Sequence, residues 1–106
     1  MAEWLDVAPA EELPPGSWRT VDADGTPIAV FNVNGEYRAI EDMCTHDGGT
    51  LTGGSVEGAE VVCPRHGARF SLLSGEALSP PAYEPVATFP VRVERGMVQV
   101  RNCRQD

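Results

Sequence analysis

The amino-acid sequence predicts an all-β protein, because its clearest local patterns are hairpins and its only candidate helix is short. Residues 27–33 (PIAVFNV) and 36–42 (EYRAIED) are rich in β-branched and aromatic side chains. The Asn-Gly pair at 34–35 between them is typical of a two-residue hairpin turn. The candidate helix, a turn around residues 8–13, is stopped by the two prolines that follow it. The segments of regular structure are therefore expected to be strands.

Two further hairpins are predicted, one before and one after the first. Upstream, residues 17–23 (SWRTVDA) end at the Asp-Gly pair at 24–25, so this strand should pair with the one that begins at Pro27. Downstream, residues 89–101 (FPVRVERGMVQVR) alternate apolar and polar side chains around an Arg-Gly turn. The alternation predicts four valines on the inward face of this hairpin: Val91, Val93, Val98 and Val100.

Two long loops interrupt these strands. Glycine and threonine dominate residues 44–60 (CTHDGGTLTGGSVEGAE), which contain few large apolar side chains. A core of its own cannot order this loop, so something else must. Residues 74–85 (SGEALSPPAYEP) form a second loop, which three prolines make stiff.

The bulk composition is that of one folded domain spanning residues 1–106. The formal net charge is -8, from 16 acidic residues against eight arginines, which disfavours nucleic acid. Two interpretations of the acidity stay open: it keeps the protein in solution, or it steers the protein toward basic partners. No stretch is apolar and long enough for a membrane span, and the acidic N-terminus lacks the pattern of a secretory signal. These features predict a protein of the cytoplasm that does not bind a membrane.

Both histidines and two of the three cysteines fall in two short motifs. The motifs are C-x-H at 44–46 and C-x-x-H at 63–66, and each follows a predicted strand. In a reducing compartment such cysteines more often bind metal or do redox chemistry than form disulfides. The third cysteine, Cys103, lies in the C-terminal tail without a nearby histidine and is expected to be a spare thiol with no role.

Two thiolates and two imidazoles can hold either zinc or an iron-sulfur cluster. Zinc fingers usually place both cysteines together and both histidines on a helix, whereas each motif here supplies one of each and has no helix available. A 2Fe-2S cluster with mixed ligands gives two thiolates to one iron and two imidazoles to the other, so each loop must supply one ligand to each iron. The observed pairing meets this requirement, and zinc is the weaker interpretation.

At these positions the sequence resembles the Rieske family of 2Fe-2S proteins. The resemblance covers nearly the whole chain, since the segment HGARFSLLSGEAL at 66–78, the proline loop and the closing valine hairpin also follow the order of the family. It implies a small antiparallel β-sandwich with two cluster-binding loops and one 2Fe-2S cluster. It further implies that Cys44 and Cys63 ligate the buried iron, and that His46 and His66 ligate the outer iron near the surface.

The resemblance also implies roles for residues around the cluster. Three glycines would let backbone amides approach the sulfurs: Gly48, Gly49 and Gly67. Two prolines would close the third side of the cluster: Pro80 and Pro81. Three charged residues near the histidines would tune the docking of partners: Asp47, Arg65 and Arg69.

Four departures from the Rieske proteins of respiratory quinol-oxidising complexes bear on the reduction potential. Those proteins resemble this chain, but they carry a disulfide between the two loops and a serine and a tyrosine that donate hydrogen bonds to the cluster. The corresponding positions here are Gly49, Arg65, Ala68 and Phe70. Fewer donors stabilise the reduced charge less, so the sequence predicts a low potential, on the order of -150 mV.

The resemblance implies a Rieske-type ferredoxin, a small one-electron carrier between a flavin-dependent reductase and a terminal oxygenase of the ring-hydroxylating type. The chain itself is not expected to be an enzyme, because a mononuclear iron oxygenase needs further histidines and the cluster takes both of those present. We expect a monomer that docks transiently with both partners by electrostatic attraction. Two alternatives stay open: a small Rieske-like subunit of a larger complex, such as an assimilatory nitrite reductase, and a structural zinc module.

Overall fold

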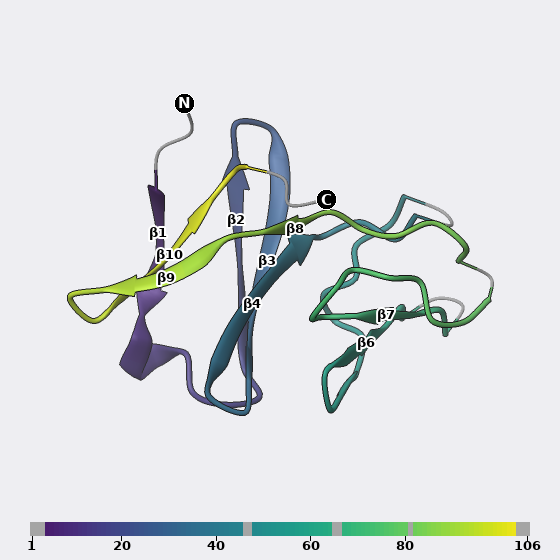
Figure 1. Cartoon of the computed structure of the whole chain (residues 1–106), viewed down its shortest axis with the longest axis horizontal. Helices are drawn as coiled ribbons and strands as arrows, with labels where there is room; N and C mark the ends of the chain where they lie inside the picture. Colours follow the sequence, from purple (N-terminus) through teal and green to yellow (C-terminus); the bar gives the residue numbers. More distant parts are fainter. Residues whose placement is uncertain (1–3, 46–47, 65–66, 81, 104–106) are drawn as a thin grey trace.

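The computed structural model describes residues 4–45, 48–64, 67–80 and 82–103. In this part of the chain, ten strands form three antiparallel sheets. Figure 1 shows two lobes, with two of the sheets in the lobe at the left and the third sheet among the long loops at the right. The predicted all-β class is confirmed.

A four-stranded sheet has the strand order β2-β3-β4-β8. Its strands are β2 (Trp18–Ala23), β3 (Thr26–Val33), β4 (Glu36–Glu41) and β8 (Thr88–Phe89). The turn between β3 and β4 has φ angles of 53° at Asn34 and 93° at Gly35, the positive pair that a type I′ turn requires. The two hairpins predicted at residues 17–42 are therefore confirmed.

A three-stranded sheet has the order β1-β10-β9. Its strands are β1 (Trp4–Pro9), β9 (Val91–Glu94) and β10 (Met97–Arg101). The predicted helical turn at 8–13 is shorter than expected, because β1 runs to Pro9 and only the 3-10 turn η1 (Ala10–Glu12) follows. Among the residues described, no helix has the length and apolarity that crossing a membrane would demand.

The closing hairpin β9-β10 bears out only part of the predicted inward face. Val98 and Val100 are fully buried, and Val91 is half-buried. Val93 is 47% exposed, so its predicted inward placement is wrong. Alternation along a strand predicts the face to which a side chain points, but not whether that face is buried. Because β9 is an edge strand of its sheet, the burial of its side chains depends on how far the opposing sheet extends.

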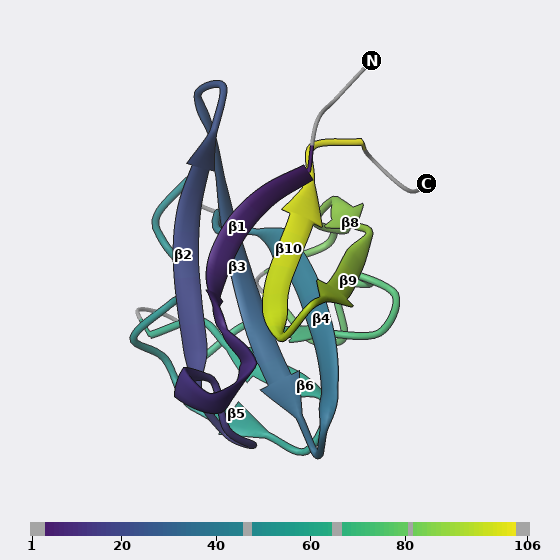
Figure 2. The ribbon, with the colours of Figure 1, turned by 90° about the vertical axis from the view of Figure 1, so that its left-hand side faces the viewer.

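The two sheets of the larger lobe pack face to face as a sandwich. Figure 2 shows β1 and β10 crossing in front of β3 and β4. The core between the sheets consists of buried side chains from both sheets and of Leu13, which follows η1: Leu13, Ala23, Ile28, Val30, Ala39, Phe89, Val98 and Val100. The antiparallel β-sandwich that the resemblance implied is confirmed.

Strand β3 is buried on both of its faces. Ile28 and Val30 point into the sandwich core, whereas Ala29 and Phe31 belong to a second core beneath the smaller lobe. Successive side chains of a strand point to opposite faces, so the uninterrupted apolar run at 28–31 supplies both cores. The four-stranded sheet therefore packs against the other sheet of the larger lobe on one face and against the smaller lobe on the other.

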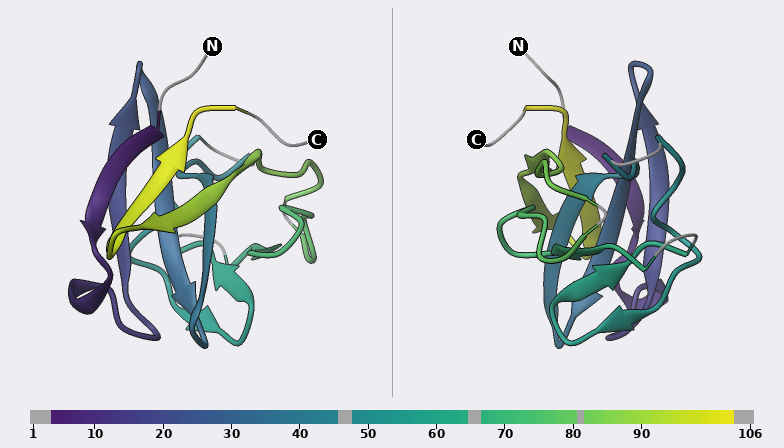
Figure 3. Two further views of the ribbon diagram at one scale, coloured as in Figure 1. Left: turned by 60° about the vertical axis from the view of Figure 1, so that its left-hand side comes forward. Right: turned by 90° about the vertical axis from the view of Figure 1, so that its right-hand side faces the viewer.

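The smaller lobe contains a sheet that the sequence did not predict. Its order is β5-β6-β7, and its strands are β5 (Val56–Glu57), β6 (Glu60–Val62) and β7 (Arg69–Ser71). Figure 3 shows this sheet in front of β3 and β4 in the right-hand view. Strands of two or three residues leave too little periodicity to be recognised among glycines. The predicted long loop at 44–60 is thus partly a hairpin.

Candidate metal centre

The two cysteines of the C-x-H and C-x-x-H motifs lie in the core beneath the smaller lobe. Cys44 is 0% exposed and Cys63 is 1% exposed, and both belong to one cluster of buried side chains that includes Leu51 and Phe70. Neither is half of a disulfide. Cys103, in contrast, is exposed in the C-terminal tail. The structure therefore brings together the two predicted sulfur ligands and leaves the third cysteine outside.

Each of these cysteines begins a short loop, and the two loops close in the same way. In the first loop, the Cys44 N–H donates to the Gly49 carbonyl (2.6 Å) and the Gly48 N–H donates to the Cys44 carbonyl (2.7 Å). In the second loop, the Cys63 N–H donates to the Ala68 carbonyl (2.7 Å) and the Gly67 N–H donates to the Cys63 carbonyl (3.1 Å). The two half-motifs therefore share one backbone construction.

The fifth position of each loop requires glycine. Gly48 has a φ of 77° and Gly67 has a φ of 75°, in the left-handed region that L side chains with a Cβ adopt only under strain. The positive φ angle is therefore a sufficient reason for glycine at both positions. The predicted approach of their amides to cluster sulfurs stays a prediction. Gly49 helps to close the first loop, because its carbonyl oxygen accepts a hydrogen bond from the Cys44 N–H.

Five of the predicted site residues lie outside the described part of the chain. They are His46, Asp47, Arg65, His66 and Pro81. The positions of the imidazole ligands and of two of the predicted docking charges therefore stay predictions.

The loop predicted at residues 74–85, here called the third loop, is tied to the first cysteine loop and to β7 beside the second. The Thr45 hydroxyl donates to the Glu84 carbonyl (2.7 Å), which joins the first loop to the third. Beyond the second loop, the Arg69 N–H donates to the Ser79 hydroxyl (3.1 Å), and the Leu78 N–H donates to the Arg69 carbonyl (2.7 Å). The third loop thus lies beside the first loop and beside β7, and Pro80 is exposed on it.

The positions that carry hydroxyl donors in respiratory Rieske proteins are buried and apolar here. Ala68 and Phe70 are both 0% exposed and pack in the same cluster as Cys44 and Cys63. Neither side chain can donate a hydrogen bond. The environment of the thiols is therefore as poor in side-chain donors at these two positions as the sequence predicted.

Arg69, a predicted docking charge, is engaged by acidic side chains. Its guanidinium lies 3.2 Å from Glu57 Oε1 and 3.4 Å from Glu60 Oε1. The hydrogen bond to Glu57, and next the charge of Glu57, raise the pKa of Arg69 above its ordinary value. The guanidinium stays charged throughout the neutral range, but its field is offset by two carboxylates. Arg69 therefore has less influence on docking than an isolated arginine would have.

Asp42, which was not among the predicted site residues, holds the first loop to the rest of the lobe. Asp42 is 5% exposed, and its carboxylate accepts hydrogen bonds from Leu51 and Thr52. The sequence offered only a weak signal, an acidic residue two positions before a predicted ligand, because its burial depends on partners nine and ten residues further along the chain.

The chemistry of these residues fits a 2Fe-2S cluster. Two buried thiols supply the soft sulfur donors that iron-sulfur clusters take, and the apolar core around them excludes water. Each thiol begins a loop of the same construction, and each loop carries one histidine in its sequence. The division of one sulfur and one nitrogen per loop is the division that mixed ligation of two irons needs.

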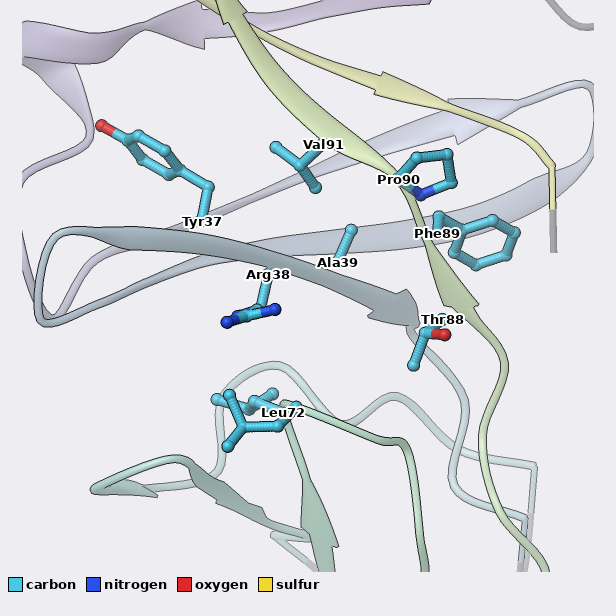
Figure 4. A pocket seen from close by; sticks show the side chains of 9 residues that line it. Tyr37, Arg38, Ala39, Leu72, Thr88, Phe89, Pro90 and Val91 are labelled. Carbon is cyan, nitrogen blue, oxygen red and sulfur yellow. The ribbon is translucent and has the colours of Figure 1, made fainter. Parts of the chain in front are cut away.

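A separate cleft of about 240 Å³ lies where the two lobes meet. It is lined by residues of β4, by Leu72 and Leu73, and by residues 88–91. Figure 4 shows Arg38 and Leu72 pointing into it from the two lobes. The Arg38 guanidinium forms an ion pair with Glu36 (2.7 Å), and the lining contains no thiol. The cleft is therefore a junction between lobes and not the cofactor site.

The chain matches known proteins over nearly its full length. The sequence profile of the Rieske 2Fe-2S domain family matches residues 3–90. The chain is 35% identical over 98 residues to the ferredoxin component of the naphthalene 1,2-dioxygenase/salicylate 5-hydroxylase systems of a Ralstonia species, covering 92% of this chain and 94% of the relative. It is 43% identical over 91 residues to the 3-phenylpropionate/cinnamic acid dioxygenase ferredoxin subunit of Shigella flexneri, covering 85% of each chain.

Solved structures show the same likeness. A chain in the complex of reduced oxygenase and oxidised ferredoxin of carbazole 1,9a-dioxygenase superposes with a TM-score of 0.92 at 36% identity, covering 97% of this chain and 96% of that one. The ferredoxin of Sphingomonas yanoikuyae B1 superposes with a TM-score of 0.83 at 30% identity, covering 95% and 100%. The fold and the paired loops define an iron-sulfur protein, and the chain belongs to the Rieske 2Fe-2S domain family. Its cofactor is one 2Fe-2S cluster, which sets aside the zinc module.

Proposed function

We propose that this chain is the ferredoxin component of a ring-hydroxylating oxygenase system. It takes one electron at a time from a flavin-dependent reductase and delivers it to a terminal oxygenase. The observation that carries this proposal is the coverage of the match. The aligned region covers 92% of this chain and 94% of a relative named as a ferredoxin component. Because that relative is named as a ferredoxin component, the chain serves as an electron carrier and not as an enzyme.

The ligand assignment belongs to the same proposal. Cys44 and Cys63 would hold the inner iron, since their side chains are buried in the core beneath the smaller lobe. His46 and His66, the nitrogen donors of the two motifs, would hold the outer iron and would be the point from which the electron leaves for a docked partner. When bound, the cluster accepts and releases a single electron. The protein's own contribution is to hold two thiols away from water and to fix both loops by the paired backbone hydrogen bonds.

A spectroscopic experiment tests the cluster and its ligands together. The purified protein should be coloured, and dithionite should bleach it and produce the EPR signal of a reduced cluster with mixed histidine and cysteine ligation. Cys63→Ser should abolish the colour, whereas Cys103→Ser, which alters the exposed cysteine, should leave the spectrum unchanged. A colourless wild-type protein, or an unchanged spectrum in Cys63→Ser, would refute the assignment.

The alternative of a permanent subunit in a larger complex, such as an assimilatory nitrite reductase, is separated from the carrier by its assembly. A carrier should elute as a coloured monomer and should turn over repeatedly between catalytic amounts of reductase and oxygenase. A permanent subunit should elute only in a stable large assembly. The names of the relatives, which are ferredoxin components and subunits of dioxygenase systems, support the carrier.

A further inference from the structure

The two cysteine loops close alike but are anchored differently. The second loop joins β6 to β7, which pair with each other, so Val62 faces Arg69 across the base of the loop. The first loop leaves β4, and β4 is already paired with β3 on one side and with β8 on the other. A strand has only two hydrogen-bonding edges, so the chain that follows the first loop cannot pair with β4. The first loop needs another anchor.

The carboxylate of Asp42 occupies the place where that anchor is needed. Its Oδ1 accepts the N–H groups of Leu51 (2.8 Å) and Thr52 (2.9 Å), and its Oδ2 accepts the Thr52 hydroxyl (2.8 Å). Its own N–H donates to the Pro27 carbonyl at 2.8 Å, which ties it to β3. Both oxygens thus hold the chain nine and ten residues further on, where a returning strand would otherwise lie.

The bonded residue Leu51 carries this anchorage to the thiols. Its side chain is 0% exposed and lies in the same buried cluster as Cys44 and Cys63. Fixing the Leu51 N–H to Asp42 therefore fixes one wall of the core that surrounds both sulfurs. A displaced Leu51 would also admit water to that core.

The charge of Asp42 lies close to the first sulfur ligand. Because consecutive Cα atoms are 3.80 Å apart, the Cα atoms of Asp42 and Cys44 are at most about 7.6 Å apart. The three donors described above are uncharged, and the residue is only 5% exposed, so water screens its charge weakly. A negative charge held this close to a redox centre disfavours the added electron.

We propose that Asp42 is a positioning residue of the cluster site, which replaces strand pairing as the anchor of the first loop and whose buried negative charge lowers the reduction potential. The second part rests on the proposed function, because it requires a cluster at Cys44 and Cys63. The first part concerns the protein alone. The two parts can therefore fail separately.

Hydrogen exchange measured by mass spectrometry tests the anchor. In Asp42→Asn the side chain keeps one acceptor oxygen but loses the other, and in Asp42→Ala it loses both. Exchange in the peptide that contains Leu51 and Thr52 should become about tenfold faster in Asp42→Asn and faster still in Asp42→Ala, because bonds to a charged acceptor are lost. The peptide spanning β7 should exchange as in the wild type. Equal loosening of both peptides, or no change in either, would overturn the anchor.

Redox titration of the same proteins tests the charge. Thr52→Val removes one hydrogen bond and keeps the carboxylate, so it is the matched control for Asp42→Asn, which removes the charge in nearly the same shape. Asp42→Asn should shift the midpoint potential to more positive values, and Thr52→Val should shift it less. Equal shifts, or a negative shift in Asp42→Asn, would overturn the electrostatic part. If Asp42→Ala does not fold, Asp42→Asn and Thr52→Val still test both the anchor and the charge effect. A colourless wild-type protein would refute the proposed function, and the hydrogen-exchange experiment would still test the anchor.

Discussion

Ala68 and Phe70 are buried in the same cluster of side chains as the two candidate sulfur ligands. Both are fully buried beside the thiols, at positions where a hydroxyl would donate to the cluster in respiratory relatives of the family. A hydrogen bond to a charged acceptor contributes about 1.5–3 kcal/mol, and only the part that differs between redox states moves the potential. The absence of hydroxyl groups at these two positions therefore favours a low potential.

Adding the missing hydroxyl groups should raise the reduction potential. We expect Ala68→Ser and Phe70→Tyr each to raise it by on the order of 50 mV, because 59 mV is a tenfold change for a one-electron couple. Protein-film voltammetry would measure the shift. Phe70→Leu changes packing at the same position without a hydroxyl and should move the potential less. A lower potential in both hydroxyl variants would contradict the explanation.

At the scale of single elements, β6 positions the second cysteine, and Gly54 fits β6 closely. A Cβ at Gly54 would overlap the carbonyl oxygen of Val62 and would lie 3.1 Å from Pro64 Cδ. Val62 and Pro64 flank Cys63 in the sequence. The chain between the first loop and β5 therefore approaches the second loop so closely that glycine is required.

Replacing Gly54 should disturb the second loop. Gly54→Ala should lower the free energy of unfolding by about 1–3 kcal/mol, since the backbone must move to admit the methyl group. It should also speed the loss of visible absorbance on warming, because Cys63 is displaced. Ser55→Ala, at an exposed neighbour, should behave as the wild type. Wild-type stability and colour retention in Gly54→Ala would show that the contact is not restrictive.

At the scale of the whole molecule, the net charge of -8 governs how partners approach. The third loop and η1 lie in opposite lobes (Figure 1), so acidic residues on them are at different distances from the cysteine loops. Electrostatic attraction between a docking face and a basic partner speeds encounter and weakens as salt screens it. Charges on the smaller lobe should therefore matter most for electron transfer.

We expect the rate of electron transfer to a basic partner protein to fall as ionic strength rises. Glu84→Gln, on the third loop, should lower the rate at low salt by roughly twofold, as removal of one docking charge would. Glu11→Gln, in η1, has the same change in net charge and should have a smaller effect. Stopped-flow measurement across a salt series would test this. A rate independent of salt, or equal effects of the two variants, would contradict docking through the smaller lobe.

The hairpins and the candidate ligands could be predicted from the sequence, because both depend on residues that are neighbours along the chain. The Asn34–Gly35 turn follows from the φ angles that these residues tolerate, and the two motifs follow from the spacing of sulfur and nitrogen donors. Cys44 and Cys63 do lie together in one core, as their motifs predicted. The histidine positions stay predictions.

The residues that hold the site in place could be identified only from the folded structure. The Asp42 bond to Thr52 and the Thr45 bond to Glu84 join residues 10 and 39 positions apart, and no periodicity or turn signal encodes such pairs. The exposure of Val93 likewise depends on how far an opposing sheet extends. The hydrogen-bond partners and the burial of these side chains depend on contacts between segments that are distant in sequence, and such contacts exist only in the folded protein.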